Sequence, residues 1–129
     1  HGQVDCFVSI SAIEHFGLNA YGEGFIQEDL DIASMDGIHD VLKPGGVAWI
    51  TVPYGTEFKT VPNLWRIYDR ASVRDRLARR LPIEQATYFV SGPCHLGPDG
   101  AVITEEMARA FSGDPPHVAV LLKLKKPLS

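Results

Sequence analysis

Two apolar segments decide the fold: Asp5-Cys-Phe-Val-Ser-Ile-Ser11 and Val47-Ala-Trp-Ile-Thr-Val-Pro53. Each is nearly continuous in apolar residues, which is typical of strands covered on both faces in a parallel sheet. Between them, apolar residues recur at helical spacing from about Leu30 to Leu42. Parallel strands joined by a helix place the turns after the strands at one edge of the sheet, where such folds bind ligands.

The signals for the ends of this helix lie on either side of it. Gln27-Glu28-Asp29 puts acidic side chains at the helix start, where the positive end of the helix dipole favours them. Lys43-Pro44-Gly45-Gly46 ends the helix with a cation, a proline and glycines suited to left-handed turns. We expect residues 11–25, before the helix, to form a long loop.

The rest of the chain predicts another helix and two more strands. Ser72 is a suitable N-cap for a helix that Pro82 would stop at about Leu81. Val73, Leu77 and Leu81 would lie on its inner face. Strands are expected over 83–90 and 118–124, and loops over 54–69 and 91–116, the second with a short helix over about 104–111.

Composition excludes several classes of partner. The 129 residues suffice for one domain, and 45% hydrophobic with 22% charged residues is ordinary for a globular protein. A net charge of -4 gives no bulk attraction to nucleic acid, and no apolar run approaches the roughly 20 residues that span a bilayer. We therefore expect no nucleic-acid or membrane partner and a cytoplasmic setting. The arginines of the predicted second helix are expected on a solvated face: Arg74, Arg76, Arg79 and Arg80.

Cysteine and histidine do not predict a disulfide framework or a metal site. The chain has two cysteines, and Cys6 is expected to be a small buried residue within its apolar run. The other cysteine and four histidines match no familiar zinc spacing: Cys94, His1, His39, His95 and His117.

The order strand, helix, strand, helix, strand, strand resembles the C-terminal half of a class I S-adenosylmethionine-dependent methyltransferase. Asp5 to Ser11 looks like its fourth strand, and Ile13-Glu14-His15 looks like the Glu-His turn that follows this strand in many small-molecule methyltransferases. Leu42-Lys-Pro-Gly-Gly46 and the strand after it look like the turn and fifth strand. More narrowly, residues 9–22 and Asn63-Leu-Trp-Arg-Ile-Tyr68 resemble a little-studied group of methyltransferase-like proteins, some linked to glycan biosynthesis.

The resemblance implies the C-terminal half of a Rossmann-like α/β fold, with two parallel strands, a terminal antiparallel strand pair and flanking helices. It covers about residues 4–126, so we expect one partial domain over 1–129 that holds strands four to seven of the full fold. The full fold begins with a strand and a Gly-x-Gly loop, followed by a second strand whose terminal acid holds the ribose. This sequence has no such loop, because Gly45-Gly46 is a helix exit. S-adenosylmethionine is therefore the cofactor expected of a longer protein, and the chain alone is expected to have little or no activity.

The missing strands would lie beside strand four, which would otherwise be left as an apolar sheet edge over Val4 to Ile10. Such an edge readily pairs with another strand. Three explanations stand open. The chain is a piece of a longer protein, which we favour, or another chain covers the edge, or the strand pairs with its own copy in a homodimer.

The turn after the first strand contains the candidate catalytic residues. His15 could act as the base that removes a proton from the methyl acceptor, with Glu14 beside it. Ser11 and Ala12 could offer backbone contacts to the methionine part of the cofactor. The alternative is that Glu14 and His15 only hold the shape of the loop.

The two long loops contain the candidate substrate residues. Tyr21 in the first loop, and Asn63, Arg66 and Tyr68 in the second, could bind a polar acceptor such as a sugar or a carboxylate. Arg66 suits a pair of anionic oxygens because its guanidinium is a planar fork. The alternative is that these residues are loop scaffold, with Trp65 and Tyr68 covering the core.

Three functions follow from these patterns. The first is a methyltransferase that acts on a small polar or sugar-like acceptor. The second is a cofactor-free binding or assembly module built on the same half-fold. The third, a dinucleotide oxidoreductase, is supported only by the alternation of strands and helices, and fold alone does not settle chemistry.

Overall fold

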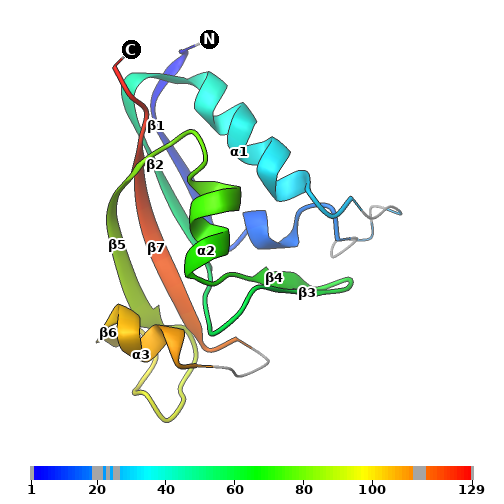
Figure 1. The fold of residues 1–129 in the computed structure, drawn as a ribbon, viewed down its shortest axis with the longest axis vertical. Helices are drawn as coiled ribbons and strands as arrows, with labels where there is room; N and C mark the ends of the chain where they lie inside the picture. The colour runs from blue at the N-terminus through cyan, green and yellow to red at the C-terminus, as the bar shows by residue number, and fades with distance from the viewer. Residues whose placement is uncertain (1, 19–21, 23, 25–26, 112–115, 129) are drawn as a thin grey trace.

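The computed structural model describes residues 2–18, 22, 24, 27–111 and 116–128, and it has an α/β fold built on a mixed five-stranded sheet (Figure 1). The strands of this sheet are β1 (Val4–Ile10), β2 (Leu42–Pro53), β5 (Ile83–Val90), β6 (Val102–Ile103) and β7 (Val118–Lys125). They lie in the order β1-β2-β7-β5-β6. β1 and β2 are parallel, whereas β7 is antiparallel to both β2 and β5.

The register of β1 and β2 confirms the predicted pair of parallel strands, with Val8 opposite Trp49. α1 (Leu30–Val41) connects the two strands, as the helical periodicity predicts. The glycine turn is present, with a φ of 81° at Gly45. Residues 42–46 nevertheless continue as the irregular start of β2, where the register with β1 shifts.

The predicted terminal antiparallel pair is also confirmed. β5 has the predicted bounds, and β7 continues to Lys125. β7 lies between β2 and β5, so the last strand of the chain is central in the sheet. Its Val120, Leu122 and Leu124 are accordingly buried.

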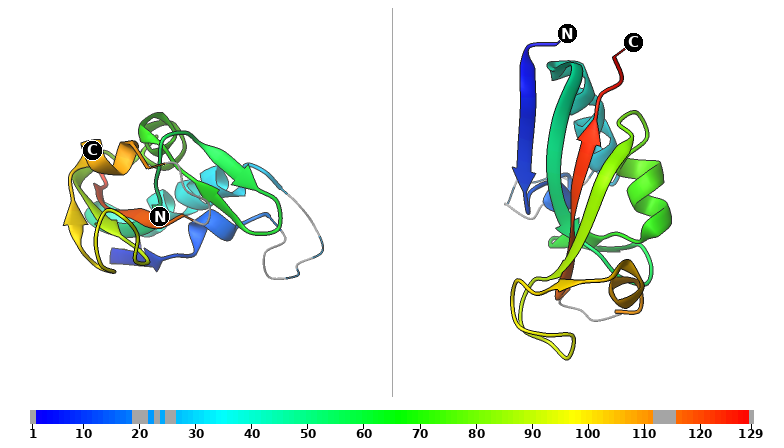
Figure 2. Two further views of the ribbon diagram at one scale, coloured as in Figure 1. Left: turned by 90° about the horizontal axis from the view of Figure 1, so that it is seen from below. Right: turned by 90° about the vertical axis from the view of Figure 1, so that its left-hand side faces the viewer.

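The helices cover one face of this sheet (Figures 1 and 2). Met35 and Ile38 of α1 belong to the same buried cluster as Ala48, Ile50 and Val52 of β2. The right-hand view of Figure 2 looks onto the opposite face, where no helix of the described residues lies over β1, β2 or β7. The core is therefore the layer between the sheet and α1 with its neighbouring helical segment.

That neighbouring segment consists of α2 (Arg70–Ser72) and η2 (Val73–Leu77), a single wide helical turn. The prediction of Ser72 as its N-cap is wrong, because the helix begins earlier, after Asp69. Asp69 Oδ1 accepts a hydrogen bond from the Ser72 amide at 2.8 Å, and Ser72 Oγ accepts one from the Asp69 amide at 2.8 Å. This reciprocal pair is a capping box. The helix ends before Leu81, but Leu81 is buried as predicted.

Four short elements occupy segments that the sequence predicts as loop: η1, β3, β4 and β6. A hairpin of β3 (Lys59–Val61) and β4 (Trp65–Ile67) lies within 54–69, and η1 (Ile13–His15) is a single 3-10 turn after β1. α3 (Glu105–Arg109) corresponds to the predicted short helix, and β6 precedes it. Asn63 turns the hairpin with a φ of 64°, which suits asparagine better than most residues.

The two edges of the sheet differ. β6 is two residues long, and short edge strands resist pairing with other chains. β1 is a seven-residue edge whose Val8 and Ile10 are 58% and 60% exposed. The prediction that Cys6 is buried is wrong: Cys6 is exposed, because nothing in the described part of the chain covers this side of β1. The predicted apolar edge over Val4 to Ile10 is confirmed.

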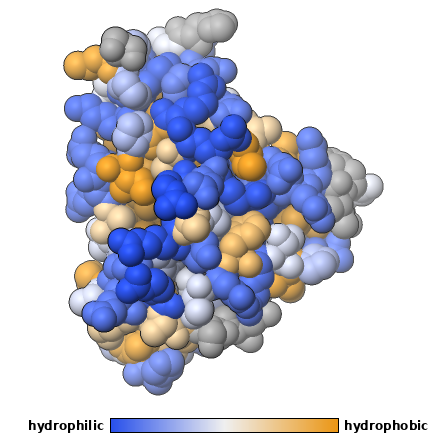
Figure 3. All heavy atoms as spheres, viewed as in Figure 1, coloured by the Kyte–Doolittle hydropathy of each residue, from blue (hydrophilic) through white to orange (hydrophobic). Residues whose placement is uncertain are grey.

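The face of the molecule shown in Figure 3 is mostly hydrophilic, with separate apolar patches. Arg74, Arg79 and Arg80 are exposed, as predicted. Arg76 is the exception, with a side chain only 19% exposed. None of the helices in the described ranges has the length and apolar character needed to cross a membrane.

Candidate functional site

A pocket of about 220 Å³ lies where the carboxyl ends of the parallel strands β1 and β2 meet the amino end of β7. It brings together three of the predicted site residues, Ser11, Glu14 and His15. The remaining lining comes from β2, β4, β7 and the loops beside them: Val52, Pro53, Trp65, Ser91, Pro116, Val118 and Ala119. The polar groups therefore lie at the sheet edge where ligands are expected.

The chain reverses sharply at Ser11, which makes the turn into the pocket possible. Ser11 has a φ of 52°, a left-handed conformation that few residues other than glycine adopt. Its amide donates a hydrogen bond to Thr51 Oγ1 of β2 at 2.9 Å. The two parallel strands are thus tied together at the point where β1 ends. Backbone strain of this kind often accompanies functional sites.

The ring of His15 is oriented by the hairpin that the sequence did not predict. Its Nδ1 contacts the carbonyl oxygen of Leu64, and because a carbonyl only accepts, Nδ1 carries the hydrogen. In the neutral ring the lone pair then belongs to Nε2. Nε2 lies 3.7 Å from Glu14 Oε2. His15 therefore presents its basic nitrogen on the side of the neighbouring carboxyl group.

Glu14 is a buried carboxyl group beside this histidine. The residue is 3% exposed, and its Oε1 has no hydrogen-bond partner among the described residues. Burial raises the pKa of Glu14 above its ordinary value, although a hydrogen bond from its own backbone and the proximity of His15 lower it in part. Glu14 is thus able to hold a proton at a pH where an exposed glutamate has lost it.

The raised pKa of Glu14 predicts a pH dependence of stability. In the unfolded chain Glu14 titrates near 4.5, so its stabilising contribution is complete below that pH and is lost as the pH rises through the folded pKa. Glu14→Gln cannot titrate. Between about pH 4 and pH 8, the free energy of unfolding of the unaltered protein should therefore fall relative to that of the variant. Urea unfolding at several pH values measures this difference, and parallel profiles for the two proteins would contradict it.

Trp65 is a pocket residue that the sequence did not single out for binding. Its indole Nε1 is buried and has no hydrogen-bond partner among the described residues. A tryptophan N–H that is buried usually has a partner. The only sequence signal was the position of Trp65 in a loop after a strand. That position does not distinguish a residue that binds a ligand from one that covers the core.

The other predicted substrate residues do not line this pocket. Asn63 is exposed and makes the hairpin turn. Arg66 and Tyr68 are fully buried, so the structure does not support the assignment of either to a substrate. Tyr21 lies outside the described residues. Ala12 does not line the pocket and instead accepts the backbone hydrogen bond of His15 at 3.0 Å, which closes the 3-10 turn.

Arg66 and Tyr68 belong to a buried network around Asp31, which is 0% exposed. Tyr68 donates its hydroxyl to Asp31 Oδ2 at 2.7 Å, and Arg76 donates to both carboxylate oxygens, at 3.0 and 2.8 Å. Arg66 Nε lies 3.7 Å from Asp31 Oδ1. Burial and the Asp31 carboxylate raise the pKa of the Tyr68 hydroxyl well above its usual range. The guanidinium of Arg76 also lies 4.8 Å from the ring centre of Phe58.

This network holds the loop that carries Glu14 and His15. Arg66 Nη1 donates to the carbonyl oxygen of Ile13 at 3.4 Å, and its Nη2 donates to that of Glu28 at 2.8 Å. The two carbonyls flank the loop on either side. Gly17 adds a close approach, since a Cβ there would lie 2.1 Å from the carbonyl oxygen of Gln27. Arg66 is thus a positioning residue behind the pocket.

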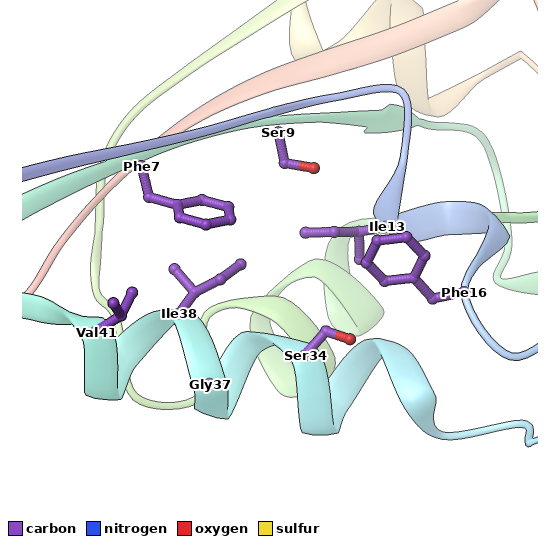
Figure 4. A pocket seen from close by; sticks show the side chains of 8 residues that line it. All are labelled: Phe7, Ser9, Ile13, Phe16, Ser34, Gly37, Ile38 and Val41. Atoms are coloured by element: carbon purple, nitrogen blue, oxygen red, sulfur yellow. The ribbon is translucent and has the colours of Figure 1, made fainter. Parts of the chain in front are cut away.

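A second pocket of about 210 Å³ lies between β1 and α1 (Figure 4). Phe7, Ile13 and Ile38 point toward one another inside it, and Ser9 is its one polar residue from β1. Its walls are mainly apolar, so it offers space for a side chain rather than for chemistry. It lies on the face of β1 that α1 covers.

The described residues form neither a metal site nor a complete site for the expected cofactor. No group of three or more histidine, cysteine or acidic side chains within the described ranges could hold a metal ion. The pocket of about 220 Å³ is smaller than the roughly 300 Å³ from which ligand sites usually begin. The described residues therefore do not enclose a whole S-adenosylmethionine molecule.

Comparison with known proteins gives a family match. Residues 1–78 match the profile of a protein family described as "Caenorhabditis protein of unknown function, DUF268". The matched part runs from β1 to η2 and includes Ser11, Glu14, His15 and Trp65 of the pocket. No curated protein matches the chain.

Proposed function

The chain belongs to the DUF268 family, whose description assigns no activity, and we propose that it supplies the acceptor side of an S-adenosylmethionine-dependent methyltransferase. The acceptor is a small polar or sugar-like molecule. One observation carries the proposal: an oriented histidine and a buried carboxyl group share a pocket at the carboxyl ends of two parallel strands. A histidine in such a place suits removal of a proton from an acceptor.

The sheet supports the finer description of the fold as the second half of a Rossmann-like methyltransferase domain. Two parallel strands are followed in the chain by an antiparallel pair, as this half requires. β1 would be the fourth strand of the full sheet, and its open edge is where the preceding strands would lie. The setting we propose is cytoplasmic.

Three residues have a defined part in the proposal: His15, Leu64 and Glu14. His15 Nε2 receives the proton that the acceptor oxygen loses when it is methylated. Leu64 holds the ring in the required tautomer through Nδ1, and Glu14 stabilises the protonated ring. The cofactor supplies the electrophilic methyl group. Because the pocket does not enclose it, residues beyond those described would have to bind its adenosine.

A cofactor-free assembly module is the second candidate, and the edge of β1 favours it. Val8 and Ile10 are exposed on β1, an edge strand of the described sheet with one charged residue, Asp5. Asp5 already lies 3.7 Å from Lys43. A second copy of the chain could pair with this edge in a homodimer.

The test is the melting temperature of the protein made from its complete reading frame, with and without S-adenosylhomocysteine. A ligand that binds only the native state stabilises it by about 2.7 kcal/mol at 100 times its dissociation constant. We expect a clear rise with S-adenosylhomocysteine and none with NAD, the matched control for an oxidoreductase.

The assembly module makes the opposite prediction. It gives no shift with either nucleotide and a dimer in light scattering that Val8→Lys converts to a monomer. That combination would rule out the methyltransferase.

A further inference from the structure

A third pocket, of about 300 Å³, lies between β5 and the helical segment formed by α2 and η2. It shares no lining residue with the pocket that contains His15. Its volume reaches the roughly 300 Å³ from which small-molecule sites usually begin. This pocket is therefore large enough for a small ligand, and the proposed methylation does not use it.

The inner wall of this pocket is apolar and aromatic. Val73 and Leu122 are buried members of the core and line it together with Tyr54 and Tyr88. The ring centres of the two tyrosines lie 5.0 Å apart at an interplanar angle of 60°, an edge-to-face arrangement. A ligand in this pocket would thus place an apolar body against the inner wall.

The rim of the pocket is cationic. Arg70 and Arg74 line it, and both residues are exposed, so a ligand can reach them from solvent. They are four positions apart in one helical segment and therefore lie on the same side of it. Of the described residues, no acidic one lines the pocket. The rim therefore favours an anionic group.

Arg70 is the arginine that is available to a ligand. It has no ion pair among the described residues. Burial raises the pKa of the Tyr88 hydroxyl, and the positive charge of Arg70 offsets part of that rise, so this charge acts on the pocket. Arg74 already donates to both carboxylate oxygens of Asp75, at 2.9 and 3.3 Å, but its guanidinium has further N–H groups.

Two other carboxylates lie near the pocket, and each has partners of its own. Glu105 accepts a hydrogen bond from Tyr54 at 2.9 Å and lies 3.8 Å from Arg109. Asp69 accepts the amide of Ser72 at 2.8 Å, where its charge favours the start of the helix. Neither carboxylate lines the pocket.

We propose that this pocket binds a small monocarboxylate with a ring-sized apolar body, its carboxylate on Arg70 and Arg74 and its ring against Leu122. The planar fork of an arginine matches the two oxygens of a carboxylate. A monoanion also matches the one rim arginine that has no ion pair, whereas a phosphate monoester would bring about two negative charges to it. The inference goes beyond the proposed function and does not rest on it.

Saturation-transfer NMR on the protein from its complete reading frame tests the ligand class. The probes are benzoate, benzamide, acetate and phenyl phosphate, at low ionic strength because salt screens exposed charges. Benzamide has the shape of benzoate without its charge, and acetate has the charge without the ring. We expect a dissociation constant on the order of 1 mM for benzoate and values at least about tenfold higher for benzamide and acetate.

Three substitutions locate the site. Arg70→Gln removes the available charge, so the dissociation constant for benzoate should rise about tenfold. Ala86→Leu enlarges a lining side chain of β5 and should weaken benzoate binding by a similar factor. Arg79→Gln is the matched control, because it removes the charge of an exposed arginine outside the pocket and should change binding by less than about twofold. Circular dichroism verifies that each variant is folded.

Four results would overturn the inference: no binding of benzoate, benzamide or acetate binding as tightly as benzoate, tighter binding of phenyl phosphate, or equal effects of Arg70→Gln and Arg79→Gln. The melting test with S-adenosylhomocysteine succeeds or fails independently of this experiment. The two pockets share no lining residue, so either proposal can stand without the other.

Discussion

Asp31→Ala should lower the free energy of unfolding by about 3–5 kcal/mol, because it leaves the charge of a buried arginine unpaired. Asp31 is 0% exposed and accepts hydrogen bonds from Tyr68 and Arg76, while Arg66 Nε lies 3.7 Å from it. Since native domains are stable by only about 5–15 kcal/mol, this change could remove much of the stability. Urea unfolding followed by circular dichroism measures it.

A matched control lies on the same helix. Asp36 of α1 is also paired with an arginine, Arg80, but at 3.8 Å and with a side chain 43% exposed. Asp36→Ala should therefore cost no more than about 0.5 kcal/mol, as exposed ion pairs usually do. Asp31→Asn keeps the shape and two polar atoms, so it should lower the free energy of unfolding by less than Asp31→Ala does. It supplies the measurement if the alanine variant does not fold.

Loss of Asp31 should also affect the pocket. Arg66 contacts the carbonyl of Ile13, next to Glu14, so loss of Asp31 should also loosen the turn. Hydrogen exchange of the Glu14 and His15 amides should be faster in Asp31→Asn than in Asp36→Ala. A cost below about 1 kcal/mol for Asp31→Ala would show that the network is not a source of stability.

The sheet was predictable from the sequence wherever an apolar run lies between clear turn signals. β2 and β7 have continuous apolar runs with clear turn signals, and β5 ends where Pro82 and Ser91 place its limits. β1 has the same apolar pattern, but the described residues leave it exposed. Apolar pattern predicts that a strand should be covered and does not say by what.

The short elements were not predictable for a different reason. β3 and β4 are three residues each, too short for a periodic pattern, and only Pro62-Asn63 marked their turn. The cap of the second helix was misplaced because Asp69 and Ser72 are both good N-cap residues three positions apart. In a capping box the first of them is the cap and the second is N3.

The site was predictable in part. Glu14 and His15 share a pocket because they follow a strand at the edge where the turns of parallel strands gather. Arg66 and Tyr68 were predicted to bind substrate because polar residues in loops are usually exposed. They are instead buried around Asp31, whose position in a helix gave no sign that it is a buried charge. Pairing across distant segments decided this, and a single sequence does not show it.

His15→Asn should lower kcat by about 10² to 10⁴ in the methyltransferase assay, since that is what loss of a general base usually costs. The assay uses the protein from its complete reading frame, labelled S-adenosylmethionine and a panel of small polar and sugar-like acceptors. Asparagine can still donate to the carbonyl of Leu64 as Nδ1 does, so the turn should keep its shape. The affinity for S-adenosylhomocysteine should stay within about threefold, because His15 acts on the acceptor.

The split between kcat and KM separates a base from a structural residue. Loss of a base should lower kcat in His15→Asn while KM for the acceptor stays within about threefold, whereas a loosened turn should raise that KM. His39→Asn is the matched control, because His39 lies on α1 next to Asp40 and away from the pocket. Full activity in His15→Asn, or a loss confined to KM, would mean that His15 only shapes the turn. The proton would then have to leave through Glu14, the other ionisable group in the pocket.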